Sequence, residues 1–239
     1  MSSPSLLPTA DVLVLGPHPD DSEIANAGTL LLLQRAGQRV VLLDVTRGEK
    51  GSRGTAAERA AEAAAAAQQL GVLARGNLGL PDTGVRVDDH ATDLLVGAMR
   101  AVRPTLLLGP HAQDVHPDHT AVAQLAERAW FLAGLRNYQP QLGAPHRPRV
   151  FLRYPGNRPI EPTLVVDITA VADQKAAVVR CFRSQLNPPD RAHLVLGLDV
   201  AERALVRDQF YGARIGVRAG EPFWHDGPLP VRDVAPLLG

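Results

Sequence analysis

Two short segments combine histidine with aspartate in a way that suits a metal site. The first, GPHPDD, contains His18, Asp20 and Asp21, and the second is HPDH at residues 116–119. Two imidazoles and one carboxylate are a ligand set that zinc uses in enzymes, because it leaves one coordination position open for water. The sequence therefore predicts a three-ligand metal centre built from both segments.

The spacing within the segments suggests a role for each side chain. His18 and Asp21 are three positions apart, so a tight turn can aim both at one ion. Asp20 then points elsewhere and is placed to act as a base for a metal-bound water. His119 supplies the third ligand, and His116 lies on the same side of the chain if its segment opens a helix.

A single HPDD segment also has a purely structural interpretation. Proline and aspartate are ordinary residues of turns and helix N-termini. Two such segments, each following a predicted strand, favour the metal site instead. The GxGxxG, GxSxG and P-loop patterns are absent from the sequence, which disfavours a dinucleotide site, a serine nucleophile and a nucleotide phosphate site.

The first three predicted elements form a βαβ unit. Residues 11–16 (DVLVLG) and 40–45 (VVLLDV) are apolar, β-branched runs typical of buried strands, and residues 24–34 between them are typical of an apolar helix. Such a unit implies a parallel sheet with helices on its faces. The segment 46–55 (TRGEKGSRGT) is predicted to be a loop.

The remaining pattern continues this α/β alternation. Further strands are predicted at residues 77–80, 104–109, 150–154 and 164–168. Helices are predicted at residues 56–70, 88–102, 120–132, 170–184 and 200–214. The tail after residue 220 is predicted to lack regular secondary structure. We expect one domain over residues 1–239, with a Rossmann-like, mostly parallel sheet, helices on both faces and a C-terminal elaboration. Both histidine segments follow strand ends, the edge where such sheets bind ligands.

Composition removes several classes of protein. The 239 residues include 25 basic and 25 acidic side chains, and a net charge of zero argues against a general nucleic-acid binder. No apolar run reaches the roughly 18 residues of a membrane span, and residues 1–10 lack the pattern of a signal peptide. A cytoplasmic protein without a membrane partner is expected. One cysteine, Cys181, provides no disulfide framework.

The basic residues are almost all arginine. Only Lys50 and Lys175 are lysines among the 25 basic residues. GC-rich coding explains such a bias, but arginine also recognises carboxylates and phosphates bidentately. Arg47, Arg53 and Arg59 cluster in and beside the predicted loop 46–55, where they would suit an acidic substrate.

At its two histidine segments the sequence resembles the LmbE-like/PIG-L family of metal-dependent N-deacetylases, whose mark is an HPDD segment after the first strand and a later HPDH. Other segments resemble the branch that deacetylates N-acetylglucosaminyl-malate in bacillithiol biosynthesis. These are TRGEKG (46–51), GSRGT (51–55), NLGLPDTG (77–84), HRP (146–148), RSQ (183–185) and YGARIGVRAGEPF (211–223).

The resemblance implies roles for ten residues. The zinc ligands would be His18, Asp21 and His119. Asp20 would be the general base, and His116 would face the substrate carbonyl. Asp118 would form a hydrogen bond behind His116 and orient it. Four further residues would lie near the sugar or its aglycone: Glu49, Arg53, Arg59 and Asp82. For each of these four, an ordinary loop or helix-surface role is the alternative.

The resemblance implies hydrolysis of the acetamide of N-acetylglucosaminyl-malate, a small sugar conjugate. It also implies that the protein forms a homo-oligomer, for example a hexamer. Alternatives are deacetylation of a glycolipid, inositol-linked or antibiotic conjugate, a non-catalytic metal- or sugar-binding module, and a structural α/β protein. Two histidines and a carboxylate also suit Fe²⁺ and other divalent ions, so the ligand set does not fix the metal.

Overall fold

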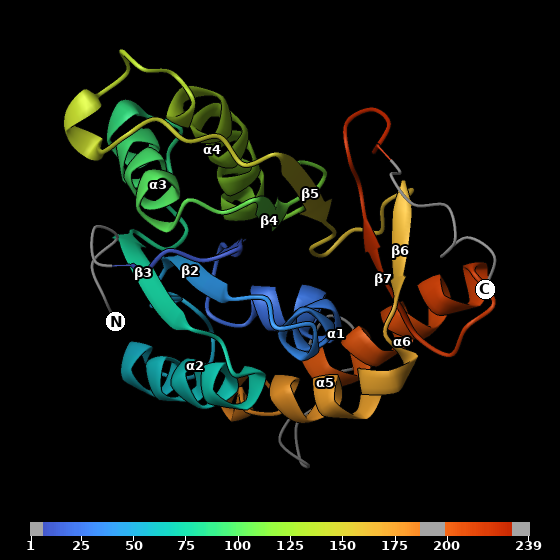
Figure 1. Ribbon diagram of the computed structural model, residues 1–239. Helices are drawn as coiled ribbons and strands as arrows, with labels where there is room; N and C mark the ends of the chain where they lie inside the picture. The colour runs from blue at the N-terminus through green and yellow to red at the C-terminus, as the bar shows by residue number, and fades with distance from the viewer. Residues whose placement is uncertain (1–6, 187–198, 231–239) are drawn as a thin grey trace.

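A five-stranded parallel sheet forms the centre of the computed structural model, which describes residues 7–186 and 199–230 (Figure 1). Its strand order is β3-β2-β1-β4-β5. The strands are β1 (Val12–Gly16), β2 (Val40–Thr46), β3 (Ala74–Leu80), β4 (Leu106–Pro110) and β5 (Val150–Tyr154). In the register of the central strand, Val12 pairs with Val40 on one side and Leu106 on the other. The order reverses between β1 and β4, which creates a crevice at their carboxyl ends.

Helices cover both faces of the sheet, as the sequence predicts. One layer contains α3 (Asp89–Val102) and α4 (Pro117–Ala133), and the other contains α1 (Asp21–Arg35), α2 (Ala56–Leu70) and α5 (Ala172–Val179) (Figure 1). Alternate side chains of β1 enter different layers: Leu13 packs with α3 and α4, whereas Val14 packs with α1 and α2. Burial on both faces explains why the sequence of the central strand β1 is continuously apolar.

The C-terminal part adds a small antiparallel sheet beside this core. Strand β6 (Leu164–Asp167) pairs with β7 (Gly220–Phe223), and α6 (Val200–Arg214) connects to β7 along the chain. The sequence predicts an irregular tail after residue 220, but β7 forms because β6 offers it a partner. Three short 3-10 helices complete the elements of the described residues: Pro140–Leu142, Thr169–Val171 and Arg183–Gln185.

Three helices differ from their predicted bounds by more than one residue. The predicted helix at 170–184 is divided into a 3-10 turn, α5 and a second 3-10 turn. Helices α1 and α4 begin earlier than predicted, at Asp21 and Pro117, so both histidine segments lie at helix N-termini. Among the described residues, no helix is both long and apolar enough to cross a bilayer.

A buried ionic network joins the C-terminal elements to α1. Lys175 Nζ lies 2.7 Å from Asp208 Oδ2 and 2.7 Å from Glu221 Oε1. Glu221 also accepts hydrogen bonds from the backbone N–H groups of Gly28 and Thr29 in α1, at 2.8 and 2.7 Å. Because all three charged side chains are buried, the network fixes α6 against α1 beside the crevice.

A second buried network holds the first turns of α1 against the sheet. Arg75 of β3 donates from Nε and Nη2 to the two carboxylate oxygens of Asp44, at 2.7 and 2.8 Å, and from Nη1 to Glu23 of α1. Burial raises the pKa of both Asp44 and Glu23, and the Arg75 charge opposes that effect. Arg75 therefore compensates electrostatically for the burial of two carboxylates.

Replacing Arg75 with methionine leaves Asp44 and Glu23 buried without their cation. We expect Arg75→Met to lower the free energy of unfolding by about 3–5 kcal/mol. Urea denaturation measures the change. Arg128→Met is the control, because Arg128 pairs with the exposed Asp89 on the surface, and it should cost no more than about 1 kcal/mol. Equal losses in the two variants would contradict the role of Arg75.

Candidate metal and substrate site

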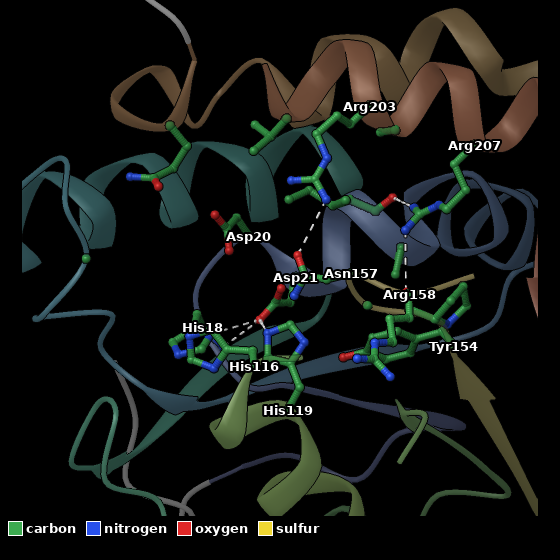
Figure 2. Close-up of a pocket in the computed structure, with 18 of the residues that line it drawn as sticks. His18, Asp20, Asp21, His116, His119, Tyr154, Asn157, Arg158, Arg203 and Arg207 are labelled. Carbon is green, nitrogen blue, oxygen red and sulfur yellow. Dashed lines mark hydrogen bonds and ion pairs between the residues drawn. The ribbon is translucent and has the colours of Figure 1, made fainter. Parts of the chain in front are cut away.

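The two histidine segments meet at the carboxyl ends of β1 and β4, where the strand order reverses. A pocket of about 820 Å³ opens there (Figure 2). His18, Asp20 and Asp21 line it from the turn after β1, and His116 and His119 line it from the start of α4. The pocket therefore brings together side chains far apart in the sequence, as the parallel sheet predicts.

The turn between β1 and α1 contains a strained residue. Asp20 has φ 135°, a backbone angle that residues other than glycine rarely adopt. Arg59 of α2 supports the turn, since its Nη2 donates to the Pro19 carbonyl at 2.8 Å and lies 3.0 Å from Asp20 Oδ2. Thr46 Oγ1 also donates to the Pro17 carbonyl at 3.0 Å. These contacts stabilise a conformation that separates the Asp20 side chain from that of Asp21.

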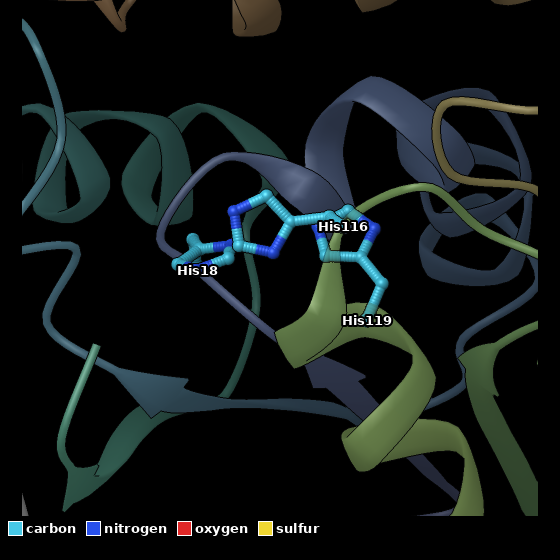
Figure 3. Close-up of side chains that lie close together, drawn as sticks. All are labelled: His18, His116 and His119. Atoms are coloured by element: carbon cyan, nitrogen blue, oxygen red, sulfur yellow. The ribbon is translucent and has the colours of Figure 1, made fainter. Parts of the chain in front are cut away.

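Asp21 lies between the two predicted histidine ligands. Its Oδ2 atom is 3.1 Å from His18 Nδ1 and 3.2 Å from His119 Nε2. Figure 3 shows the imidazoles of His18, His116 and His119 gathered at the N-terminus of α4. Asp21 thus joins the two predicted histidine ligands, and the ring of His116 lies beside both of theirs.

The other nitrogen of each ligand ring faces a buried carboxylate. His18 Nε2 lies 3.2 Å from Asp82 Oδ1 and 3.2 Å from Asp118 Oδ2, and His119 Nδ1 lies 3.1 Å from Asp114 Oδ2. Metal-binding histidines usually donate their second N–H in this way, which orients the ring and makes it a better ligand. The contacts leave His18 Nδ1 and His119 Nε2 facing Asp21, as a metal ligand set requires.

The charges of the site also fit a divalent cation. Burial lowers the pKa of both histidines, but hydrogen bonds and charges from the surrounding carboxylates, Asp21 foremost, raise that of His18 to about 9 and that of His119 to about 10. The pKa of Asp21 is lowered despite its burial, because His119 and His18 surround it. Positive charge is therefore favoured where these side chains meet, which is compatible with a bound cation.

Two further sets of possible metal donors lie at this place. Within the described residues, ligand atoms lie within 4.8 Å of one another in two groups, His18 with His116 and His119, and His18 with Asp82 and Asp118. In the second group, backbone amides already occupy both carboxylates: Lys50 N donates to Asp82 at 2.7 Å and Thr83 N donates to Asp118 at 2.7 Å. Those two carboxylates are better suited to orient His18 than to bind an ion.

Asp20 and His116 have properties that suit proton transfer and hydrogen bonding. Burial raises the pKa of Asp20 to about 7, against the opposing charge of Arg59. Burial and the neighbouring His18 and His119 lower the pKa of His116. His116 Nδ1 accepts the backbone N–H of Asp118 at 3.2 Å, so the neutral ring carries its proton on Nε2. Asp118 contacts His116 through this amide, while its carboxylate contacts His18.

The four residues that the resemblance places near the sugar lie in different surroundings. Arg59 and Asp82 line the pocket, but both are buried and hydrogen-bonded to other parts of the site. Glu49 and Arg53 are not among the described residues that line the pocket. Glu49 accepts the backbone N–H of Asp82 at 2.9 Å, and Arg53 donates to the Leu186 carbonyl at 3.0 Å.

Sequence reasoning misses three residues that the structure brings to the site. Asp114 holds His119, and Asn157 holds Asp114 by donating from its backbone N at 2.8 Å and from Nδ2 at 3.0 Å. Arg203 of α6 lines the opposite wall. Asp114 and Asn157 follow β4 and β5 at the carboxyl edge, a signal that could have identified them, whereas Arg203 looks like any helix-surface residue.

Comparison with known proteins agrees with the motifs. The family model PIG-L, described as GlcNAc-PI de-N-acetylase, matches residues 13–130, which include both histidine segments. A solved structure of a conserved protein from Thermus thermophilus is 40% identical, with a TM-score of 0.83 over 95% of this chain and 98% of that one. The chain belongs to the PIG-L/LmbE family.

Named PIG-L relatives differ in their reactions and substrates. The 1D-myo-inositol 2-acetamido-2-deoxy-alpha-D-glucopyranoside deacetylase of Streptomyces avermitilis is 29% identical, over 70% of this chain and 75% of that protein. The probable N-acetyl-alpha-D-glucosaminyl L-malate deacetylase 2 of Bacillus subtilis is 28% identical, over 73% and 82%. The 4-oxalmesaconate hydratase of Pseudomonas putida is 27% identical, over 74% and 75%.

The site geometry makes Asp114 a positioning residue for this PIG-L protein. Replacing Asp114 with asparagine retains its size but removes the charge that faces His119 Nδ1. We expect Asp114→Asn to weaken zinc affinity about 10–100-fold, measured by competition with a chromophoric chelator. Asp173→Asn is the control, because Asp173 is an exposed residue that pairs with the exposed Arg218. Unchanged affinity in Asp114→Asn would show that Asp114 does not support the ligand.

Proposed function

We propose that this PIG-L protein is a metal-dependent N-deacetylase that removes the acetyl group of an N-acetylglucosaminyl conjugate. The observation that carries the proposal is the convergence of His18, Asp21 and His119 next to a separate buried carboxylate, Asp20. Ligands for one ion and a base on the same turn are what metal-assisted amide hydrolysis requires.

In this proposal each side chain has one task. His18 Nδ1, Asp21 and His119 Nε2 would hold the ion, with zinc as the expected metal. A divalent ion at that place supplies polarisation of the amide carbonyl and a lowered pKa for water. Asp20 takes a proton from the attacking water and can return it to the leaving amine. His116 donates a hydrogen bond from Nε2 to the oxygen on which negative charge develops.

Two aglycones are candidates within this function. The Bacillus subtilis relative supports N-acetylglucosaminyl-malate, and the Streptomyces avermitilis relative supports an inositol-linked sugar. A hydratase is the second candidate function, because the Pseudomonas putida relative bears that name at comparable identity. Acetate release from the malate and inositol conjugates by zinc-loaded protein supports deacetylation. Hydration of 4-oxalmesaconate without acetate release from either conjugate would contradict it.

The two motif residues Asp20 and His119 are expected to fail in different ways. Asp20→Asn should retain bound zinc but lose at least about 100-fold in kcat, the usual contribution of a general base. His119→Ala should lose zinc, because one of three ligands is removed. Zinc content by atomic absorption and acetate release measure both effects.

The control for these variants is His90→Ala, because His90 is exposed and lies outside the pocket. It should retain both zinc and activity. Normal turnover by Asp20→Asn would overturn the base assignment. Full zinc content in His119→Ala would overturn its assignment as a ligand.

A further inference from the structure

Acidic side chains line one end of the pocket, together with Arg59 and Lys50, and the charged side chains of the other end are arginines. The lining carboxylates, Asp20, Asp21 and Asp82, belong to the end that contains the histidines. The wall formed by α6 and the loop after β5 contributes Arg158, Arg203 and Arg207 to the lining (Figure 2). In the described part of the chain, no acidic side chain lines that wall.

Arg203 and Arg207 differ in how their charges are satisfied. Arg207 donates to the carbonyl oxygens of Ile24 and Pro155 and lies 3.8 Å from a carboxylate oxygen of Asp208. Arg203 makes one long contact, from Nη2 to Asn157 Oδ1 at 3.5 Å. Arg158 is exposed. Over residues 7–186 and 199–230, neither Arg158 nor Arg203 forms a salt bridge.

A half-buried guanidinium without a carboxylate partner is electrostatically unfavourable. Arg203 and Arg207 are four positions apart on α6, so both project from one side of the helix. Burial and the nearby Arg207 charge lower the pKa of Arg203, and the charge of Asp114 opposes this only in part. A bound anion would relieve the repulsion between the Arg203 and Arg207 charges. The planar guanidinium group can bind two carboxylate or phosphate oxygens at once.

We propose that Arg203 and Arg158 form a subsite for an acidic aglycone, so that the substrate is an N-acetylglucosaminyl conjugate carrying a carboxylate or a phosphate. The inference rests on the proposed deacetylase function and adds the chemical class of the aglycone. It favours the malate type of conjugate over the neutral inositol type. The sugar then lies between the subsite and the histidines, with its acetamide toward Asp20 and His116.

The structure links this subsite to the metal ligands. Asn157 accepts the Arg203 contact through Oδ1 and donates to Asp114, and Asp114 in turn holds His119. Gly156 packs against the same pair, and a Cβ atom at that position would overlap Asp114 and His119. The loop after β5 therefore sets the position of Arg203 relative to His119. This subsite differs from the sequence expectation for Arg59, whose guanidinium is engaged with the Asp20 turn.

Steady-state kinetics of the zinc-loaded protein test the subsite with three substrates. These are N-acetylglucosaminyl-malate, N-acetylglucosamine 1-phosphate and the neutral N-acetylglucosaminyl-inositol. Arg203→Gln and Arg158→Gln are compared with Arg214→Gln, a control on the same helix whose arginine pairs with the exposed Glu161. Thermal unfolding checks that all three variants fold.

We expect wild-type protein to prefer an acidic conjugate. Arg203→Gln should raise KM for that conjugate about tenfold, the loss expected for one charge-assisted hydrogen bond, with kcat within about twofold. Arg158→Gln should act in the same direction, and neither variant should change KM for the inositol conjugate. The preferred acidic substrate distinguishes a carboxylate from a phosphate ligand.

Two results would overturn the subsite. One is wild-type preference for the inositol conjugate, and the other is an equal rise in KM for acidic and neutral conjugates. If none of the three releases acetate, the proposed function fails separately. Calorimetric binding of the malate and inositol conjugates to wild type and Arg203→Gln then decides the subsite alone, and equal affinities for the two conjugates would refute it.

Discussion

The site depends on the turn between β1 and α1, where Asp20 is held at φ 135°. The strain is sustained because Arg59 binds both the Pro19 carbonyl and the Asp20 carboxylate, while β2 supports Pro17 through Thr46. Without this conformation the consecutive aspartates could not take the separate roles that we propose for them. Strained residues of this kind persist where the surrounding structure holds them, and they are concentrated at functional sites.

Carboxylates organise the rest of the site around that turn. Asp114 lies behind His119, and Asp82 and Asp118 lie behind His18, so each ring is held between acidic groups. Backbone amides from the loops around the site bind these carboxylates in turn, as that of Thr83 does with Asp118. Ordered loops at the carboxyl edge thus convert a common α/β sheet into a site with fixed ring orientations.

The sequence predicted the parallel sheet and the meeting of the two histidine segments, because buried strands and strand-end motifs leave local signals. It did not predict β7, whose pairing partner β6 is distant in sequence. Arg59 illustrates a second limit: its type suggested substrate binding, but its contacts with the Asp20 turn arise only when α2 packs beside α1. Arg203 carries no local signal at all, since its place on the pocket wall follows from how α6 docks.

The central claim is that a metal held by the two histidine segments is required for amide hydrolysis. Removing metal with a chelator, adding back zinc in steps and following acetate release from N-acetylglucosaminyl conjugates tests it most directly. We predict no acetate from the metal-free protein and full recovery at one equivalent of zinc per chain. Acetate release that persists without metal, or that zinc fails to restore in a folded protein, would contradict it.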